Sequence, residues 1–242
     1  MTTTLARTEL RLFLRDPGTT LFGVLLPAAV LAGLGSVPAL REPSAMFGGQ
    51  RFVDYFAPSL LAISIAVLGL QNLPVGLASY REKGVLRRLS ATPVRPQTVL
   101  VAQLVINLVT AALGTLLMVA VAVGLFGVPA PRHPAGFVVA ALLGTAAVFA
   151  LGLVVAGVAP RARSATAVGT VLFMLTQFFA GVYLPRFLLP EPVVAIGAYV
   201  PPGVTAFQDA WTGDGPQPLQ LLVMAAIAVV ATAVAARVFR WQ

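Results

Sequence analysis

Residues 97–127 read QTVLVAQLVINLVTAALGTLLMVAVAVGLFG, a stretch that carries no charged residue and consists largely of Val, Leu and Ala. A helix needs about 20 apolar residues to cross roughly 30 Å of hydrocarbon, so this stretch is long enough to span a bilayer. Comparable uncharged runs occur on both sides of it, and together they predict six transmembrane helices. The six runs cover residues 19–40, 55–79, 97–127, 135–159, 165–185 and 218–236.

The composition indicates an all-α, polytopic membrane protein. Hydrophobic residues make up 58% of the 242 residues and charged residues only 10%, which is far from the balance of a soluble domain. The chain has no cysteine and one histidine, His133, which excludes disulfides, thiolate metal sites and histidine clusters. Its cations lie in short segments between apolar runs, so a nucleic-acid partner is not expected. We therefore predict no metal site and no catalytic residue.

Lys and Arg residues are distributed unequally between the two sides of the predicted bundle. Cytoplasmic loops of membrane proteins carry an excess of Lys and Arg, so the richer side is predicted to be cytoplasmic. This prediction places both termini in the cytoplasm and the chain in the cell membrane as a multi-pass protein. The richer side carries Arg7, Arg11, Arg15, Arg81, Lys83, Arg87, Arg88, Arg95, Arg161, Arg163, Arg237 and Arg240, and the other side carries Arg41, Arg51, Arg132 and Arg186.

Residues 1–18 are predicted to form an amphipathic helix at the cytoplasmic membrane surface. Arg7, Arg11 and Arg15 recur at helical spacing on one face, while apolar residues such as Leu10 occupy another. The alternative is a charged flank that only sets the topology.

Residues 186–217 are too long for a simple loop and too broken for a membrane span. Their apolar part, residues 192–207, is interrupted by Gly197, Pro201 and Pro202. A segment broken in this way predicts an extracellular re-entrant or interfacial region before the last span. The alternative is an outer hairpin that packs on the bundle without a functional role.

The most cationic segment, residues 80–96, reads YREKGVLRRLSATPVRP and joins two of the apolar runs. Leu86 and Leu89 lie three residues apart, as on one face of a helical turn. Pro93 and Pro96 follow, and they are expected to end this helical turn. This pattern predicts a cytoplasmic coupling loop that binds another protein, rather than a simple connection between two helices.

Three groups of residues carry a family resemblance. They are Arg15-Asp16-Pro17 with Pro27, then residues 82–89 with Thr92-Pro93-Val94, and then residues 179–185 with Leu189-Pro190, Tyr199-Val200-Pro201-Pro202 and Asp209. In this combination the chain resembles the membrane subunits of ABC type-2 exporters, in particular the actinobacterial drug and antibiotic resistance permeases similar to the daunorubicin exporter subunit. The likeness extends over nearly the whole chain.

The resemblance implies that residues 1–242 form a single ABC type-2 transmembrane domain. Such a subunit pairs with a second permease copy, identical or different, within membrane lipid, and docks two separate ABC ATPase subunits. ATP and Mg²⁺ would be bound by those ATPases, and no cofactor by this chain. Glu82 and Arg88 would be charged contacts to the ATPase. The alternative is that their charges only set the membrane topology and interact with solvent. The residues assigned to ATPase coupling are Arg7, Arg11, Arg15, Arg81, Glu82, Lys83, Gly84, Leu86, Arg88 and Leu89.

The residues themselves also indicate that nucleotide chemistry lies outside this chain. A phosphate-binding loop needs a Gly-x-x-x-x-Gly-Lys-Ser/Thr pattern, so that backbone amides and the lysine hold the phosphates. Lys83 is the only lysine, and Gly84 follows it in place of Ser or Thr. We therefore predict that the chain is not an enzyme and that a partner hydrolyses any ATP.

Isolated polar residues within the apolar runs are the candidates for a substrate pathway. No charged residue lies inside a run, which argues against a proton-coupled carrier, although an ATPase-independent secondary efflux carrier stays open as the alternative. The expected cargo is a hydrophobic or amphipathic small molecule, such as a drug, an antibiotic or a lipid-like compound. The candidates, whose alternative role is hydrogen bonding between helices, are Gln71, Asn72, Gln103, Asn107, Thr176 and Gln177, with Phe178 and Phe179 beside them.

Overall fold

The computed structural model describes residues 21–85, 97–183 and 188–238, and every regular element within these ranges is a helix. Four helices in the described ranges are long and apolar enough to cross a membrane: Phe52–Glu82, Val99–Phe126, Pro134–Val158 and Pro218–Val238. They coincide with four of the six predicted runs. Runs 19–40 and 165–185 also contain helices, but these are shorter than predicted, so the number of six spans stays a prediction.

The helices follow one another along the chain with short 3₁₀ and π segments (η) between some of them. Their bounds are η1 (Leu21–Leu25), α3 (Leu26–Gly35), η2 (Pro38–Leu40), η3 (Ala45–Phe47), α4 (Phe52–Ala66), η4 (Val67–Asn72), α5 (Leu73–Glu82), α7 (Gln97–Phe126), α8 (Pro134–Val158), α9 (Ala162–Phe179), α10 (Glu191–Gly197), α11 (Val204–Trp211) and α12 (Pro218–Val238).

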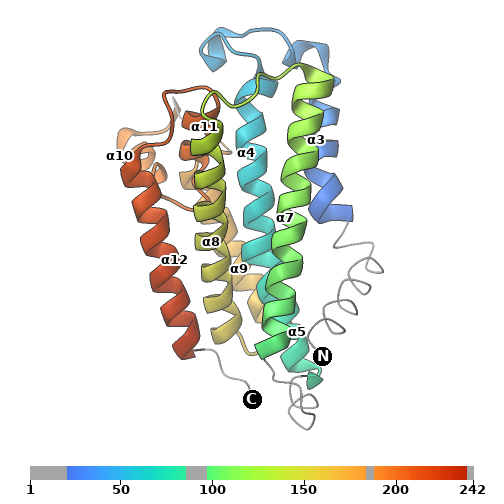
Figure 1. Cartoon of the computed structure of the whole chain (residues 1–242), viewed down its shortest axis with the longest axis vertical. Coiled ribbons are helices and arrows are strands. Elements are labelled where there is room, and N and C mark those ends of the chain that lie inside the picture. Colours follow the sequence, from blue (N-terminus) through green and yellow to red (C-terminus); the bar gives the residue numbers. More distant parts are fainter. Residues whose placement is uncertain (1–20, 86–96, 184–187, 239–242) are drawn as a thin grey trace.

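The long helices stand side by side, and α7 runs opposite to the other three (Figure 1). The span formed by α4, η4 and α5 runs downward in this view, α7 returns upward, and α8 runs downward with α12 packed along it. The ends of α5, α8 and α12 and the starts of α7 and α9 therefore share one end of the bundle, the lower end in Figure 1. Its described cations are Arg81, Lys83, Arg161, Arg163 and Arg237.

Two helices expose long apolar faces. Only 28% of the apolar window of α7 and 22% of that of α12 are buried, and Leu116 and Val229 are among the exposed side chains. Soluble proteins rarely expose apolar surface on this scale, whereas a bilayer accommodates it. The prediction of an all-α, multi-pass membrane protein is confirmed.

The span from α4 to α5 widens into the π segment η4 at its centre because Pro74 follows. Proline lacks an amide hydrogen and its ring collides with the carbonyl four residues earlier, here that of Leu70. The carbonyl oxygens of Gly69 and Leu70 meet Gly152 of α8 and Gly169 of α9, where a Cβ atom would overlap them. Only glycine permits this approach, so α8 and α9 pack directly against the middle of the span.

At the upper end, α11 is buried against α4 and α8. Phe207 and Trp211 are almost fully buried, and the indole N–H of Trp211 donates to the Pro129 carbonyl at 2.8 Å. Gln208 Nε2 donates to Ser59 Oγ of α4 at 3.1 Å. Helices α10 and α11 are separated at the predicted Gly and Pro breaks, while the re-entrant character of this region stays a prediction.

Helix α5 extends further than predicted, because Tyr80, Arg81 and Glu82 continue the helix and the loop begins only at Lys83. The helix ends there because Gly84 adopts φ = 67°, and its N–H donates to the Arg81 carbonyl at 3.0 Å. The charged residues at the start of the predicted loop are thus held rigidly on the last turn of a membrane-spanning helix.

Candidate functional site

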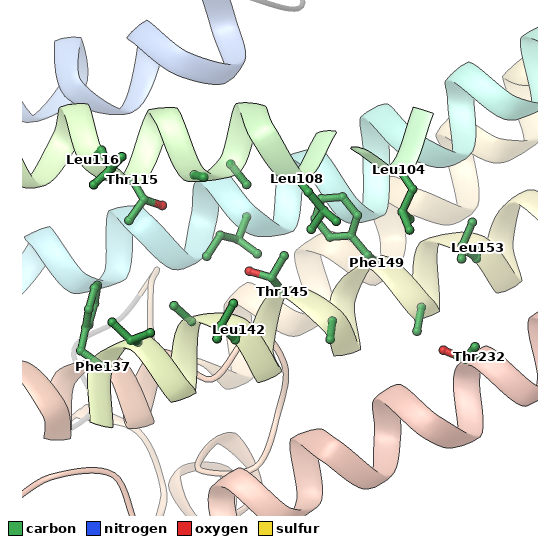
Figure 2. Close-up of a pocket in the computed structure, with 17 residues that line it drawn as sticks. Leu104, Leu108, Thr115, Leu116, Phe137, Leu142, Thr145, Phe149, Leu153 and Thr232 are labelled. Atoms are coloured by element: carbon green, nitrogen blue, oxygen red, sulfur yellow. The ribbon is translucent and has the colours of Figure 1, made fainter. Parts of the chain in front are cut away.

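An apolar groove of about 730 Å³ runs between α7 and α8 (Figure 2). Ile65 of α4 and Thr232 of α12 also contribute to its lining. Several lining residues, among them Leu116 and Leu142, are more than half exposed, so the groove is open at the surface of the bundle. Its bulky lining side chains include Leu104, Leu108 and Leu116 of α7 and Phe137, Leu142, Phe149 and Leu153 of α8.

The groove forms because its two walls pack on different partners. Helix α8 packs mainly on α12, whereas α7 packs mainly on α3 and η1. Phe149 is buried, with the half-buried Leu104 and Leu153 packed against its cluster, towards the lower end, and Phe137 packs on the ring of Trp211 at a centroid distance of 5.4 Å towards the upper end. The described residues leave the space between Phe149 and Phe137 unfilled.

Among the described residues that line the groove none is charged, and their polar groups are the hydroxyls of Thr115, Thr145 and Thr232. An apolar concavity with a few hydrogen-bonding groups suits a molecule with an apolar body and one or two polar substituents. Sequence reasoning missed this groove because Leu, Val and Ala that line a groove look the same in a sequence as Leu, Val and Ala that face lipid. The isolated threonines were the available signal.

None of the residues predicted for the substrate pathway lines this groove. Gln103 Nε2 donates to the hydroxyl of Tyr80 at 3.1 Å, which ties α7 to α5. Asn107 is buried, and its Nδ2 donates to the Gln103 carbonyl at 2.8 Å. Gln71 and Asn72 lie half-buried in η4. Gln103 thus has the interhelical hydrogen bond that was its alternative role, and a role in transport for these four residues stays a prediction.

The pathway candidates of α9 lie near the upper end of that helix. The hydroxyl of Thr176 donates to the Phe173 carbonyl at 2.9 Å, while the rings of Phe178 and Phe179 meet edge to face at 5.6 Å. Gln177 is fully buried, and neither its Nε2 nor its Oε1 atom has a hydrogen-bond partner among the described residues. A buried amide without partners is destabilising, so Gln177 lacks the compensation that Gln103 and Asn107 have.

At the lower end, two residues assigned to ATPase coupling bond to other parts of the same chain. Arg81 Nη1 donates to the carbonyls of Ala156 at 3.0 Å and Ala159 at 2.9 Å. The Glu82 carboxylate accepts from the backbone N–H of Ala162 at 3.1 Å. The prediction of a docking role did not include these bonds, because their partners lie more than 70 residues away in the sequence.

The remaining coupling candidates are placed only in part. Lys83 is exposed and Gly84 forms the end of α5. Arg161 and Arg163, at the start of α9, are also exposed at the lower end and add positive charge there. The other candidates lie outside the described residues: Arg7, Arg11, Arg15, Leu86, Arg88 and Leu89.

The chain matches the family described as ABC-2 type transporter over residues 2–208, which is most of its length. A comparison with curated proteins gives no match. Members of this family form the transmembrane component of their transporters and work with an ABC ATPase. Apolar helices of spanning length and an uncharged groove between two of them agree with that role. The chain therefore belongs to the ABC-2 type transporter family and is the transmembrane subunit of an ABC-type transporter.

Proposed function

We propose that this subunit exports a hydrophobic or amphipathic small molecule, such as a drug, an antibiotic or a lipid-like compound. The observation that carries the proposal is the uncharged groove of about 730 Å³ between α7 and α8. Ligand sites are typically apolar concavities with few polar groups, and this one can be entered from the bilayer, where such molecules concentrate. The resemblance to actinobacterial drug and antibiotic resistance permeases supports the same cargo class.

The energy for export comes from two separate ABC ATPase subunits, which hold ATP and Mg²⁺ and dock on a pair of permease copies. The docking surface comprises residues 1–18 and the loop that follows α5. In this proposal the lower end of the bundle is cytoplasmic, and the two termini are predicted to be cytoplasmic as well. The charge distribution supports that orientation, because the described cations of the upper end are only Arg41, Arg51 and Arg132, against a larger set at the lower end.

The proposal is tested by reconstituting the chain in proteoliposomes with and without its ATPase partner. The probe is a fluorescent anthracycline, an amphipathic molecule with a flat apolar body. We expect ATP-dependent transport only when the ATPase is present and no effect of a proton uncoupler. Transport without the ATPase that an uncoupler abolishes would instead identify a secondary carrier.

The role of the groove is tested by filling it. Ala112 of α7 lines the groove, whereas its neighbour Leu113 is 48% exposed and does not. We expect Ala112→Trp to lower anthracycline transport by roughly tenfold, the factor that corresponds to a loss of about 1.4 kcal/mol in binding. Leu113→Trp adds the same indole to the lipid-facing side and should leave transport unchanged. Equal transport by both variants would exclude the groove as the cargo site.

A further inference from the structure

The side chain of Arg81 closes the lower end of α8. Its Nη1 atom donates to the carbonyls of Ala156 and Ala159, at 3.0 Å and 2.9 Å. Ala156 lies in the last turn of α8 and Ala159 is its C-cap residue, and backbone oxygens at this end have no partner within the helix. A cation at this position also interacts favourably with the negative end of the helix dipole.

The next side chain closes the start of the next helix. The Glu82 carboxylate accepts from the N–H of Ala162, the first residue of α9, at 3.1 Å. Backbone N–H groups of a first helical turn likewise lack partners within the helix, and an anion is favourable at this end of the dipole. Each charge therefore lies at the helix end that its sign suits.

Consecutive positions on one helix make this arrangement possible. Successive side chains of an α-helix diverge by about 100°, so Arg81 and Glu82 reach two different neighbours from the same turn of α5. The neighbours are the two ends of a single connection, the turn from Val158 to Ala162 between α8 and α9. The pair thus spans the whole turn.

We propose that Arg81 and Glu82 are positioning residues that clamp the α8–α9 turn to the base of the coupling loop. The loop begins at Lys83, directly after the clamp, so a displacement of the loop is passed to the lower end of α8. Helix α8 forms one wall of the groove. This inference rests on the proposed function, and it differs from a direct contact between Glu82 and the ATPase.

Substitutions that separate charge from hydrogen bonding test the clamp. Glu82→Gln removes the charge but keeps an oxygen that can accept from Ala162, whereas Glu82→Ala removes both. Arg81→Lys and Arg81→Ala form the corresponding pair for the end of α8. Arg163→Ala is the control, because it removes an exposed charge from the first turn of α9 without touching the clamp.

The first measurement needs neither ATPase nor cargo. Hydrogen–deuterium exchange of residues 160–168 in the purified full chain should be roughly fivefold faster in Glu82→Ala, the factor expected when a helix loses its N-terminal cap. Glu82→Gln and Arg163→Ala should exchange close to the wild-type rate. An unchanged exchange rate in Glu82→Ala would show that the carboxylate does not hold the start of α9 and would overturn the clamp.

The second measurement follows anthracycline transport and recovery of the ATPase in the reconstituted complex. We expect Glu82→Ala and Arg81→Ala to lose most transport while retaining ATPase recovery, and Glu82→Gln and Arg81→Lys to retain most transport. If Glu82→Gln loses ATPase recovery as fully as Glu82→Ala does, the carboxylate is an ATPase contact and the clamp is not its role. If Glu82→Ala speeds the hydrogen–deuterium exchange of residues 160–168 but transports anthracycline at the wild-type rate, the positioning role is overturned. Absence of ATP-driven transport in the wild type would refute the proposed function, while the exchange data still decide the clamp.

Discussion

Replacing Gly152 by Ala tests the close approach between α8 and η4. A Cβ at this position would overlap the carbonyl oxygen of Gly69, since non-bonded atoms essentially never lie within 3.0 Å of a Cβ atom. The obstacle is a backbone carbonyl, so no rotamer change relieves the overlap. Either α8 must move away from the span that contains η4, or the π segment must change its geometry.

The size of the effect follows from two opposing terms. Overpacking a tight contact typically costs about 1–3 kcal/mol, and a backbone obstacle places this case at about 3 kcal/mol. Alanine is favoured over glycine inside a helix by up to about 1 kcal/mol. We therefore expect Gly152→Ala to lower the free energy of unfolding by about 2 kcal/mol.

The assay is reversible unfolding by SDS in mixed micelles, with Gly124→Ala of α7 as the matched control. A methyl group added at Gly124 would meet no described atom within 4 Å, so the same substitution should raise the free energy of unfolding by about 0.5–1 kcal/mol. If the Gly152→Ala variant is as stable as the wild type while the Gly124→Ala variant is stabilised, the close contact between α8 and the Gly69 carbonyl is refuted.

Two further substitutions test other contacts of the described chain. Gln177→Leu should raise the free energy of unfolding by about 1–3 kcal/mol, because it removes two buried amide atoms without partners among the described residues; heat denaturation that shows a lower stability would mean that the amide has a partner. Arg51→Ala should lower it by about 1–2 kcal/mol, because the guanidinium donates to the Asp54 carboxylate and to the carbonyls of Phe126 and Gly127. The hydrogen bond to Asp54 raises the pKa of Arg51 above its ordinary value. The charged guanidinium therefore stabilises the fold, and this stabilisation is lost only as the pH rises through the raised pKa. The difference in the free energy of unfolding between wild type and Arg51→Ala should thus be the same at about pH 7 and about pH 10, and a difference that shrinks over this interval would contradict the pairing.

Uncharged length predicted the long helices well. Runs 97–127 and 218–236 correspond to α7, Gln97–Phe126, and α12, Pro218–Val238. Charge served less well as a sign of where a helix ends, because Arg81 and Glu82 continue α5 into the predicted loop. Their side chains bond to the ends of α8 and α9, and such partners cannot be read from the local sequence.

The groove could not be predicted for a different reason. The groove exists because α7 and α8 pack on different helices, and the partners of a helix depend on the three-dimensional arrangement of the bundle. Polar residues such as Gln103 and Gln177 were more conspicuous in the sequence than Thr145, yet only Thr145 of these three lines the groove. A polar side chain within an apolar run thus indicates that a hydrogen-bond partner is required there. For Gln103 this partner is the hydroxyl of Tyr80.

Helix α8 contacts the α4–α5 span more extensively than α7 does. The ties of α8 involve its backbone, through the contact of Gly152 with the Gly69 carbonyl and the bonds of Arg81 to two carbonyls. Near the lower end, α7 contacts α5 through the hydrogen bond between Gln103 and Tyr80 and through Leu104, which packs against the cluster that contains Leu77. Through the proposed clamp, a displacement of the lower end of α5 would be passed to α8 by bonds that end on its backbone carbonyls. Helix α8 forms one wall of the groove, so the clamp connects the base of the loop with the groove through that wall.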